Sequence, residues 1–404
     1  METLTNKRIL LGVTGGIAAY KSADLIRRLQ ERGAEVLVVM TKAACEFITP
    51  LTMQALSGKP VHIELLDPAT EAGMGHIELA RWSDVIVVAP ATANFIARVS
   101  HGMADDLLSA ICLAATVPIL LAPAMNQQMW LNPATQTNIQ TLSARGIFLA
   151  GPASGMQACG EIGPGRMLEP MELAAAVNAV FTTRALDGKH VMVTAGPTQE
   201  AIDPVRFISN RSSGRMGYAI ARAAQEAGAE VTLVSGPTAL PAPERVKYVP
   251  VKTAEQMCKA VLAQAAKQDI FIATAAVADY RCAEIAGEKI KKTTADLVLA
   301  LRKNPDILAE VAQLPQPPYT VGFAAETSAI KENALVKLRS KGLDMIAANQ
   351  VGDGLGFESD ENALEVMWDG GNISLELNSK DKLARQLIDI VARRYNEKHP
   401  PQSH

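Results

Sequence analysis

The sequence predicts an α/β protein with two doubly wound, Rossmann-like domains, each built on a parallel sheet covered by helices on both faces. Short β-branched runs alternate with helical stretches along the chain, the pattern of a parallel sheet that is buried on both sides. The length of 404 residues predicts two or three domains. The opening of the chain is also echoed in its second half. We therefore expect domains at residues 1–190 and 191–404, joined near residues 182–189.

The first half opens with a strand from Lys7 that leads through Gly15 and Gly16 into a helix. This helix is expected to end just before Gly33, because glycine readily adopts the left-handed conformation that follows a helix end. A second strand then begins near Val36. The later elements expected here are buried strands at residues 84–91 and 119–122 and a helix at residues 169–181.

The second half repeats this opening from Lys189, with Gly228 in the place of Gly33 and a buried strand at residues 269–276. The further elements expected are a lysine-dense loop at residues 284–294, a helix start with Asn304 as N-cap and Pro305 at its first position, a β-hairpin at residues 362–377, and a helix from Ser379 to about Tyr395. A shared layout indicates shared architecture and says nothing about shared chemistry.

The composition excludes several classes of partner. There are 39 lysines and arginines and 42 aspartates and glutamates, and the net charge of −3 is too balanced for a main partner that is a nucleic acid or an anionic membrane. The longest apolar stretch, residues 110–125, is interrupted by Thr116, Pro118 and Pro123, so we expect no membrane span. The five widely spaced cysteines form no C-x-x-C pair, which favours a reduced, cytoplasmic protein.

The turn around Gly15 and Gly16 is typical of phosphate binding, because glycines let the backbone approach an anion and helix N-terminal amides hold it. The third glycine of the dinucleotide fingerprint is missing, and the second strand ends in Met40 and Thr41 without an acidic residue. This combination disfavours NAD and favours a mononucleotide, with Thr41 as a contact to its phosphate or ring. The alternative is a tight turn that binds no ligand.

Four further segments of the first half are candidates for a site. Residues 90–94 and 123–126 each follow a buried strand, where open α/β sheets bind ligands. Cys159 lies in the glycine-rich segment 155–167, and such a segment loses much conformational entropy when it orders, which favours a loop that closes over a ligand. His76 stands beside apolar residues. Taken singly, His76 is more often structural and Cys159 more often a buried small hydrophobe.

In the second half, residues 203–217 combine glycines, hydroxyls, an amide and three arginines just before a helix, which suits anionic groups. The alternative is a solvated basic loop. Asp279 ends a buried strand, a natural position for a metal and a triphosphate, whereas the lysines of residues 289–292 would by themselves form a solvated charge run. Lys337 and Lys341 lie four residues apart on one helix face and repel each other mildly, which an anion between them would explain.

Together these motifs resemble a known family. The first half resembles the flavin-dependent cysteine decarboxylases, which implies a flavodoxin-like flavoprotein domain. The whole chain resembles the bacterial bifunctional phosphopantothenoylcysteine decarboxylase/phosphopantothenate–cysteine ligases of coenzyme A synthesis. The matching residues of the first half are Gly15 to Ala18, His76, Pro90 to Asn94, Pro123 to Asn126, Ala158 to Gly160 and Gly163 to Met167. Two departures are Thr92, where many members have serine, and Phe95, where a small or β-branched residue is common.

For the first half, the resemblance implies FMN-dependent decarboxylation of 4′-phosphopantothenoylcysteine to 4′-phosphopantetheine. A hydride would pass from the cysteine side chain to FMN, and the resulting thioaldehyde would be the electron sink for CO2 loss. Cys159 would donate the proton, His76 would assist the oxidative step and Asn126 would bind the substrate carboxylate. The implied FMN contacts are Gly15, Gly16, Ile17, Thr41, Pro90, Thr92, Asn94 and Met125. The implied substrate contacts are Ala158, Gly160, Arg166 and Met167.

For the second half, the resemblance implies CTP-dependent ligation of 4′-phosphopantothenate with cysteine through an acyl cytidylate. Asn210 and Arg206 would bind the acyl substrate, and Asn210 would also stabilise the acyl cytidylate. Asp279 would serve the nucleotide and Mg2+, and Lys289 would close on the intermediate. The implied nucleotide contacts are Ala275, Ala276, Asp279, Lys289, Asn304, Pro305, Asp306, Ile307, Phe323, Lys337 and Lys341.

The resemblance also implies a homo-oligomer with trimeric decarboxylase contacts and dimeric ligase contacts, often assembled as a dodecamer. Three other functions are alternatives for this sequence: a non-catalytic regulator of protein phosphatases, a nicotinamide oxidoreductase and a peptidyl-cysteine decarboxylase. The presence of His76, Asn126 and Cys159 argues against the regulator, and the missing third glycine argues against the oxidoreductase. A peptidyl-cysteine decarboxylase has no reason to carry the second half.

Overall fold

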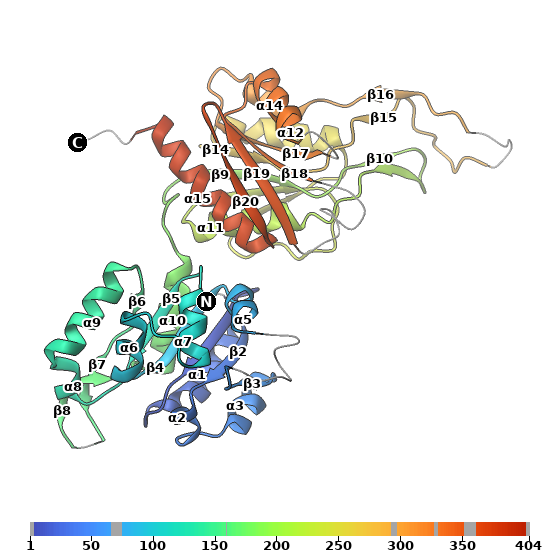
Figure 1. The fold of residues 1–404 in the computed structure, drawn as a ribbon. Coiled ribbons are helices and arrows are strands. Elements are labelled where there is room, and N and C mark those ends of the chain that lie inside the picture. The colour runs from blue at the N-terminus through green and yellow to red at the C-terminus, as the bar shows by residue number, and fades with distance from the viewer. Residues whose placement is uncertain are drawn as a thin grey trace. The chain divides into compact units, whose positions relative to one another are not determined.

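The computed structural model describes residues 4–65, 75–158, 160–291, 297–326, 330–350 and 361–400. The chain divides into two compact units, Met1–Phe181 and Thr182–His404 (Figure 1). Among the described residues, no helix is both long enough and apolar enough to cross a membrane.

The first unit contains a six-stranded parallel sheet with the order β3-β2-β1-β4-β5-β6. Its strands are β1 (Arg8–Val13), β2 (Glu35–Met40), β3 (Val61–His62), β4 (Val85–Ala91), β5 (Ile119–Pro123) and β6 (Phe148–Leu149). Without the two-residue edge strand β3, this is the flavodoxin strand order, with β1 and β4 flanking the point where the order reverses. The predicted doubly wound fold is confirmed for this unit.

Helices cover both faces of this sheet because its strands are apolar on both sides. Ile9 and Leu11 pack on one face and Leu10 on the other, all fully buried. The first face is covered by α1 (Ala19–Glu31), α3 (Pro50–Ser57) and α10 (Pro170–Phe181). The second is covered by α5 (His76–Trp82), α6 (Ala93–Ser100), α7 (Leu107–Ala114) and α9 (Pro133–Ala144). Shorter elements are α2 (Lys42–Cys45), α8 (Gln127–Leu131) and the hairpin of β7 (Ala153–Met156) and β8 (Ile162–Arg166).

The second unit contains an eight-stranded sheet with the order β13-β12-β9-β14-β17-β18-β19-β20. Its strands are β9 (His190–Ala195), β12 (Glu230–Ser235), β13 (Lys247–Pro250), β14 (Ile270–Ala273), β17 (Tyr319–Glu326), β18 (Met345–Gln350), β19 (Glu361–Trp368) and β20 (Gly371–Ser379). The first six are parallel, in the Rossmann order. β19 and β20 add the predicted antiparallel hairpin.

One face of this second sheet is covered by α11 (Arg215–Glu226) and α15 (Lys380–Lys398), and the other by α12 (Ala254–Ala265), α13 (Ile307–Ala312) and α14 (Ile330–Lys341). Ser379 caps α15 as predicted, since its side chain accepts a hydrogen bond from the Lys382 N–H. The predicted glycine positions are also confirmed, because Gly33 and Gly228 follow α1 and α11 with φ of 87° and 92°.

Two small antiparallel ladders extend from the second sheet (Figure 1). One pairs β10 (Gln199–Ala201) with β11 (Phe207–Ser209), and the other pairs β15 (Tyr280–Cys282) with β16 (Leu301–Lys303). β10 contacts β15. The second ladder leads into the lysine-dense segment that contains Lys289.

Candidate functional sites

The first unit has a cavity of about 1210 Å³ at the carboxyl ends of β1 and β4. The two strands diverge into loops there, and the Thr14 hydroxyl joins them by donating a hydrogen bond to the Pro90 carbonyl at 2.7 Å. The Thr92 N–H in turn donates to the Thr14 oxygen at 3.2 Å. The cavity therefore lies where a doubly wound sheet binds ligands.

Most residues that the sequence singled out in the first half line this cavity. They are Gly15, Gly16, Ile17, Thr41, Thr92, Asn94, Met125, Asn126, Ala158, Arg166 and Met167. Pro90 instead lies buried in β4, where its carbonyl binds Thr14. His76 is half-buried at the first position of α5, and Gly160 is exposed in the turn between β7 and β8. Cys159 lies outside the described residues.

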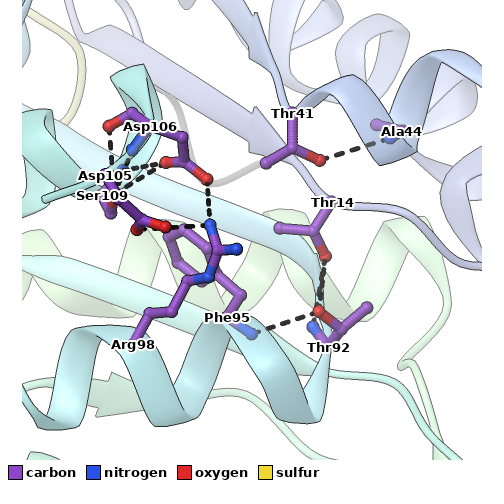
Figure 2. Close-up of polar contacts among 9 residues, drawn as sticks. All are labelled: Thr14, Thr41, Ala44, Thr92, Phe95, Arg98, Asp105, Asp106 and Ser109. Carbon is purple, nitrogen blue, oxygen red and sulfur yellow. Dashed lines mark hydrogen bonds and ion pairs between the residues drawn. The ribbon is translucent and has the colours of Figure 1, made fainter. Parts of the chain in front are cut away.

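Two of the lining hydroxyls are held by helix caps, as Figure 2 shows. Thr41 caps α2 by accepting a hydrogen bond from the Ala44 N–H, and Thr92 caps α6 by accepting one from the Phe95 N–H, each at 3.3 Å. A capping side chain keeps one orientation relative to its helix. The hydroxyl groups thus lie at fixed positions on the cavity wall.

The start of α1 contributes backbone amides to the same wall. Its N-cap is Ala18, which makes no side-chain capping hydrogen bond, so no capping side chain covers the first-turn N–H groups beside the cavity. Gly15 lets the loop after β1 pack against the loop after β2, because a Cβ at position 15 would lie 2.6 Å from the Cβ of Ala43. The Ala19 and Lys21 N–H groups already donate to the carbonyls of Gly16 and Ala18, at 2.9 and 3.0 Å, so the positive end of the helix dipole, rather than a set of free amides, favours an anion here.

A charged cluster on the cavity wall was missed by the sequence analysis. Arg98 on α6 pairs with Asp106 at 2.9 Å and with Asp105 at 3.4 Å, and all three residues line the cavity (Figure 2). Asp106 also caps α7 in a reciprocal capping box with Ser109. An acidic cap before the apolar run of α7 was the available signal.

Lys21 was also missed, because it stands on the inner face of α1. Its side chain is 8% exposed and lines the cavity. Its ammonium donates to the Met167 carbonyl at 3.0 Å and pairs with the Glu169 carboxylate at 2.7 Å. Lys21 therefore fixes the end of the β7–β8 hairpin against α1.

The turn between β7 and β8 contacts the loop that carries Asn126. The Gln157 side chain accepts a hydrogen bond from the Gln127 N–H at 3.0 Å and donates one to the Pro164 carbonyl, also at 3.0 Å. The Glu161 carboxylate accepts a hydrogen bond from the Asn126 amide at 2.9 Å. Gln157 and Glu161 were not predicted as site residues, since no local pattern connects them with a loop about 30 residues earlier.

In the second unit, Asn210 lies at the carboxyl end of β14. Its side-chain amide donates to the carbonyls of Ala276 and Val277, at 3.2 and 3.1 Å. Ala276 also forms a bridge with Pro197 beside β9. The predicted residues Asn210 and Ala276 are thus neighbours at the point where this strand order reverses.

The segment that begins at Asn304 corrects one prediction. The N-cap of α13 is Asp306, which accepts a hydrogen bond from the Ala309 N–H, and the helix starts at Ile307. The prediction of Asn304 as cap and Pro305 at the first position was wrong, because the Asn304 amide instead donates to the Ala278 carbonyl at 2.7 Å. Asn304 therefore fixes the loop around the exposed Asp279.

Lys341 has an anionic partner within its own chain. Its ammonium lies 2.8 Å from the Asp306 carboxylate, while Lys337 is exposed one turn earlier on α14. Burial alone would raise the pKa of Asp306, but hydrogen bonds from Lys341 and the Ala309 N–H lower it below its ordinary value. Phe323 is half-buried on β17 and packs against the core.

Hydrogen bonds around Asp203 fix the segment next to Lys289. The Asp203 side chain is 0% exposed, and Arg206 binds it through two nitrogens at 2.6 and 2.9 Å. The Ile290 N–H donates to the same carboxylate at 3.2 Å, and the Ile290 carbonyl accepts from Arg206 at 3.1 Å. The Arg206 guanidinium and backbone N–H groups hold the pKa of Asp203 well below its usual range. Lys289 itself is exposed.

Two family models match the chain. The model described as "Flavoprotein" matches residues 1–182, and the model described as "DNA/pantothenate metabolism flavoprotein C-terminal domain" matches residues 186–395. The two matched segments correspond to the two compact units.

Relatives match along almost the whole chain. A protein of Vibrio vulnificus (strain YJ016) named coenzyme A biosynthesis bifunctional protein CoaBC is 57% identical over 395 residues, which cover 97% of this chain and 98% of the relative. The protein of that name from Escherichia coli (strain K12) is 54% identical over 404 residues, covering 98% and 99%. The one from Bacillus subtilis (strain 168) is 43% identical over 395 residues, covering 96% and 97%.

Proposed function

The chain belongs to the CoaBC family of bifunctional coenzyme A biosynthesis proteins, and from this premise we propose how its two units divide the work. The chain is an enzyme that ligates 4′-phosphopantothenate with cysteine and decarboxylates the resulting 4′-phosphopantothenoylcysteine to 4′-phosphopantetheine. We assign the decarboxylase to residues 1–190 and the ligase to residues 191–404. The observation that supports this assignment most directly is the cavity of the first unit, which most of the predicted flavin and substrate contacts line.

The cavity of the first unit fits FMN. Its volume of about 1210 Å³ is ample for a cofactor of this size. The positive end of the α1 dipole beside Gly15 and Gly16 would favour the phosphate, and the hydroxyls of Thr41 and Thr92 would bind the cofactor from the loops after β2 and β4. FMN bound there would supply a hydride acceptor for the substrate's cysteine side chain and a hydride donor after CO2 loss, so the overall reaction would need no external oxidant.

The protein side chains bind the substrate and move its protons. Asn126 would hold the carboxylate that is lost, and Ala158, Arg166 and Met167 would contact the remainder of the substrate. His76 would assist the oxidative step. Cys159 would donate a proton to the carbon that CO2 has left, for which a thiol with an ordinary pKa of about 8.5 is a suitable acid.

In the second unit we propose CTP as the activating nucleotide. The carboxylate of phosphopantothenate attacks the α-phosphate, which releases pyrophosphate and gives an acyl cytidylate; the amine of cysteine then displaces CMP and loses a proton. Asn210 and Arg206 would bind the acyl substrate, and Lys289 would assist the second step. The proposed nucleotide contacts are Ala275, Ala276, Asn304, Pro305, Asp306, Ile307, Phe323, Lys337 and Lys341.

Mg2+ would arrive with the triphosphate, and Asp279 would supply one carboxylate to it. No group of three or more His, Cys, Asp or Glu side chains among the described residues could hold a metal ion. A site with a single protein carboxylate suits Mg2+, which is usually held by one or two carboxylates together with substrate phosphates and water. We also propose a cytoplasmic homo-oligomer, with trimeric contacts between decarboxylase units and dimeric contacts between ligase units.

One assay tests both proposed activities in the full chain. Phosphopantothenate, cysteine, CTP and Mg2+ should together give pyrophosphate, CO2 and 4′-phosphopantetheine, and the purified protein should be yellow. A colourless protein that cannot be reconstituted with FMN would refute the flavin assignment. Turnover with ATP but not with CTP would refute the nucleotide assignment while leaving the ligase activity intact.

Replacement of Cys159 by alanine tests its role as the acid. We expect Cys159→Ala to release CO2 but to leave the substrate as the oxidised enethiol, because the final proton is missing. Loss of the yellow flavin absorbance in a single turnover, together with mass spectrometry of the product, measures this outcome. Ordinary turnover to 4′-phosphopantetheine in the variant would exclude Cys159 as the donor.

A further inference from the structure

The turn between β7 and β8 presents a carboxylate to two side-chain amides beside the cavity. Glu161 Oε2 accepts hydrogen bonds from Asn126 Nδ2 at 2.9 Å and from Gln127 Nε2 at 3.2 Å. Hydrogen bonds of N–H donors to an ionised carboxylate are stronger than those to a neutral acceptor. Asn126 and Gln127 thus form a carboxylate-binding pair in the structure itself.

The orientation of the Asn126 amide is fixed by its second role. Asn126 is the N-cap of α8, and its Oδ1 accepts a hydrogen bond from the Gln128 N–H at 2.8 Å. The amide nitrogen must therefore point away from the helix, towards Glu161. Asn126 lines the cavity, so the same donor is accessible to a ligand there.

The hairpin holds Glu161 in this position by several contacts. The Met125 N–H donates to the Gly165 carbonyl at 2.9 Å, which joins β8 to the Asn126 loop. The Gln157 N–H donates to the Glu161 carbonyl at 2.8 Å, and the Gln157 side chain accepts from the Gln127 N–H. Gly163 leaves room for this packing, since a Cβ there would overlap the Gln127 side chain. Glu161 therefore faces the amide pair because of the hairpin's own geometry.

We propose that Glu161 competes from within the chain for the subsite that binds the substrate's carboxylate. This inference rests on the proposed role of Asn126 in the decarboxylase. The Glu161 carboxylate and the substrate's carboxylate cannot both bind these amides, because two negative charges side by side repel each other. The substrate must displace Glu161 to bind, and the hairpin that carries Glu161 also carries the proposed substrate contacts Ala158 and Arg166.

This competition distinguishes substrate from product. The substrate has a carboxylate that can replace Glu161, whereas 4′-phosphopantetheine has lost that group as CO2. Glu161 can return to Asn126 and Gln127 once CO2 has left, while the product keeps only its other contacts. The amide pair is therefore satisfied before binding and after reaction, and the competition weakens binding of the substrate without weakening binding of the product.

Replacement of Glu161 separates this competition from a purely structural role. In Glu161→Ala the substrate no longer displaces a bound carboxylate, so we expect its KM to fall by about three- to tenfold. The product inhibition constant should stay within about twofold of the parent value, because the product does not compete with Glu161. In Glu161→Gln, which keeps the shape without the charge, KM should fall to an intermediate value.

Both constants are measured with the FMN-loaded full chain and 4′-phosphopantothenoylcysteine, and rates are expressed per bound flavin. Glu31→Gln is the matched control, since Glu31 is an exposed glutamate in the same unit that pairs with Arg28. An unchanged or raised KM in Glu161→Ala would overturn the inference, as would equal changes in KM and in the product constant, which indicate a general change of the hairpin.

A further variant separates failure of this inference from failure of the proposed function. Asn126→Ala removes the amide itself, and KM should rise if Asn126 binds the substrate carboxylate. If KM is unchanged in Asn126→Ala, the proposed role of Asn126 is wrong. If KM rises there but does not fall in Glu161→Ala, the role of Asn126 stands and Glu161 is not a competitor.

Discussion

Among single residues, the buried Asp203 carboxylate organises a segment of the proposed ligase unit. It accepts hydrogen bonds from Arg206 and from the backbone N–H groups of Val205, Arg206 and Ile290. A buried carboxylate is stable only when such donors compensate for its lost hydration. Since Ile290 follows Lys289, the Asp203 contacts also fix the backbone from which the Lys289 side chain extends.

We expect Asp203→Asn to lower both ligase activity and stability. A neutral amide loses the ion pair with Arg206 and cannot accept all of these hydrogen bonds, so the segment with Lys289 should shift and the ligase rate should fall by about ten- to hundredfold. Decarboxylation of supplied 4′-phosphopantothenoylcysteine should be unaffected. The control is Asp381→Asn, which breaks the more exposed Arg222–Asp381 pair and should have a small effect.

The stabilising effect of Asp203 should depend on pH in one direction. Its pKa is lowered in the folded chain, so its contribution is fully present above the unfolded value of about 3.9 and is lost as the pH falls towards the lower folded value. The Tm difference between the parent protein and Asp203→Asn should therefore be constant from about pH 5 to 8 and shrink below about pH 4. A difference that stays constant into strong acid would contradict this explanation.

Among elements, the loops after β1 and β2 depend on each other for their shape. A Cβ at Gly15 would lie 2.6 Å from the Ala43 Cβ and 2.7 Å from its backbone carbon, so the two loops could not stay in contact. Both loops line the cavity and both carry proposed FMN contacts. Their separation would widen the site between Gly15 and Thr41.

We therefore expect Gly15→Ala to bind FMN about five- to 160-fold more weakly, if overpacking of about 1–3 kcal/mol falls on the bound state. The flavin absorbance per chain and FMN titration of the flavin-free protein measure the effect. Gly16→Ala is the matched comparison, because a Cβ there meets only the Thr92 methyl group, at 3.7 Å, and its loss should be smaller. Equal losses would show that the contact with Ala43 is not the reason for glycine at position 15.

The helices and strands show which parts of the fold could be predicted from the sequence. Periodicity and glycines located the parallel strands, the β19–β20 hairpin and the Ser379 cap, because local propensity and burial determine these features together. The cap of α13 was misplaced, since Asn304 is engaged by Ala278 in a distant part of the chain. The pairing of Glu161 with Asn126 was invisible for the same reason, as it joins residues 35 positions apart.

In the whole molecule, each core is formed by residues of a single unit. The core clusters of the first unit contain residues between Leu4 and Phe181, and those of the second contain residues between Leu186 and Tyr395. A substitution in one site should therefore leave the other site folded, because the core clusters of the other unit contain none of the residues of the substituted unit. This independence makes the two activities separable within the full chain.

Two variants of the full chain test this separation. Asn210→Asp places a carboxylate against the carbonyls of Ala276 and Val277, which now accept hydrogen bonds from the Asn210 amide, and repulsion should reduce ligation by about a hundredfold or more. Its decarboxylase should keep the parent rate. Cys159→Ala should do the reverse, so that pyrophosphate is released at the parent rate without formation of 4′-phosphopantetheine.

A mixture of the two variants tests whether the intermediate passes through solution. Each chain then has one working site, and 4′-phosphopantothenoylcysteine made by Cys159→Ala must leave it to reach a decarboxylase in Asn210→Asp. If the units act independently, the mixture should form 4′-phosphopantetheine after a lag that shortens as the concentration of Asn210→Asp rises, because capture of a free intermediate depends on the concentration of the site. Supplying 4′-phosphopantothenoylcysteine directly should abolish the lag. A mixture that stays inactive while each variant keeps its remaining activity would show that the intermediate is not released, and that the two units of one chain must act in succession.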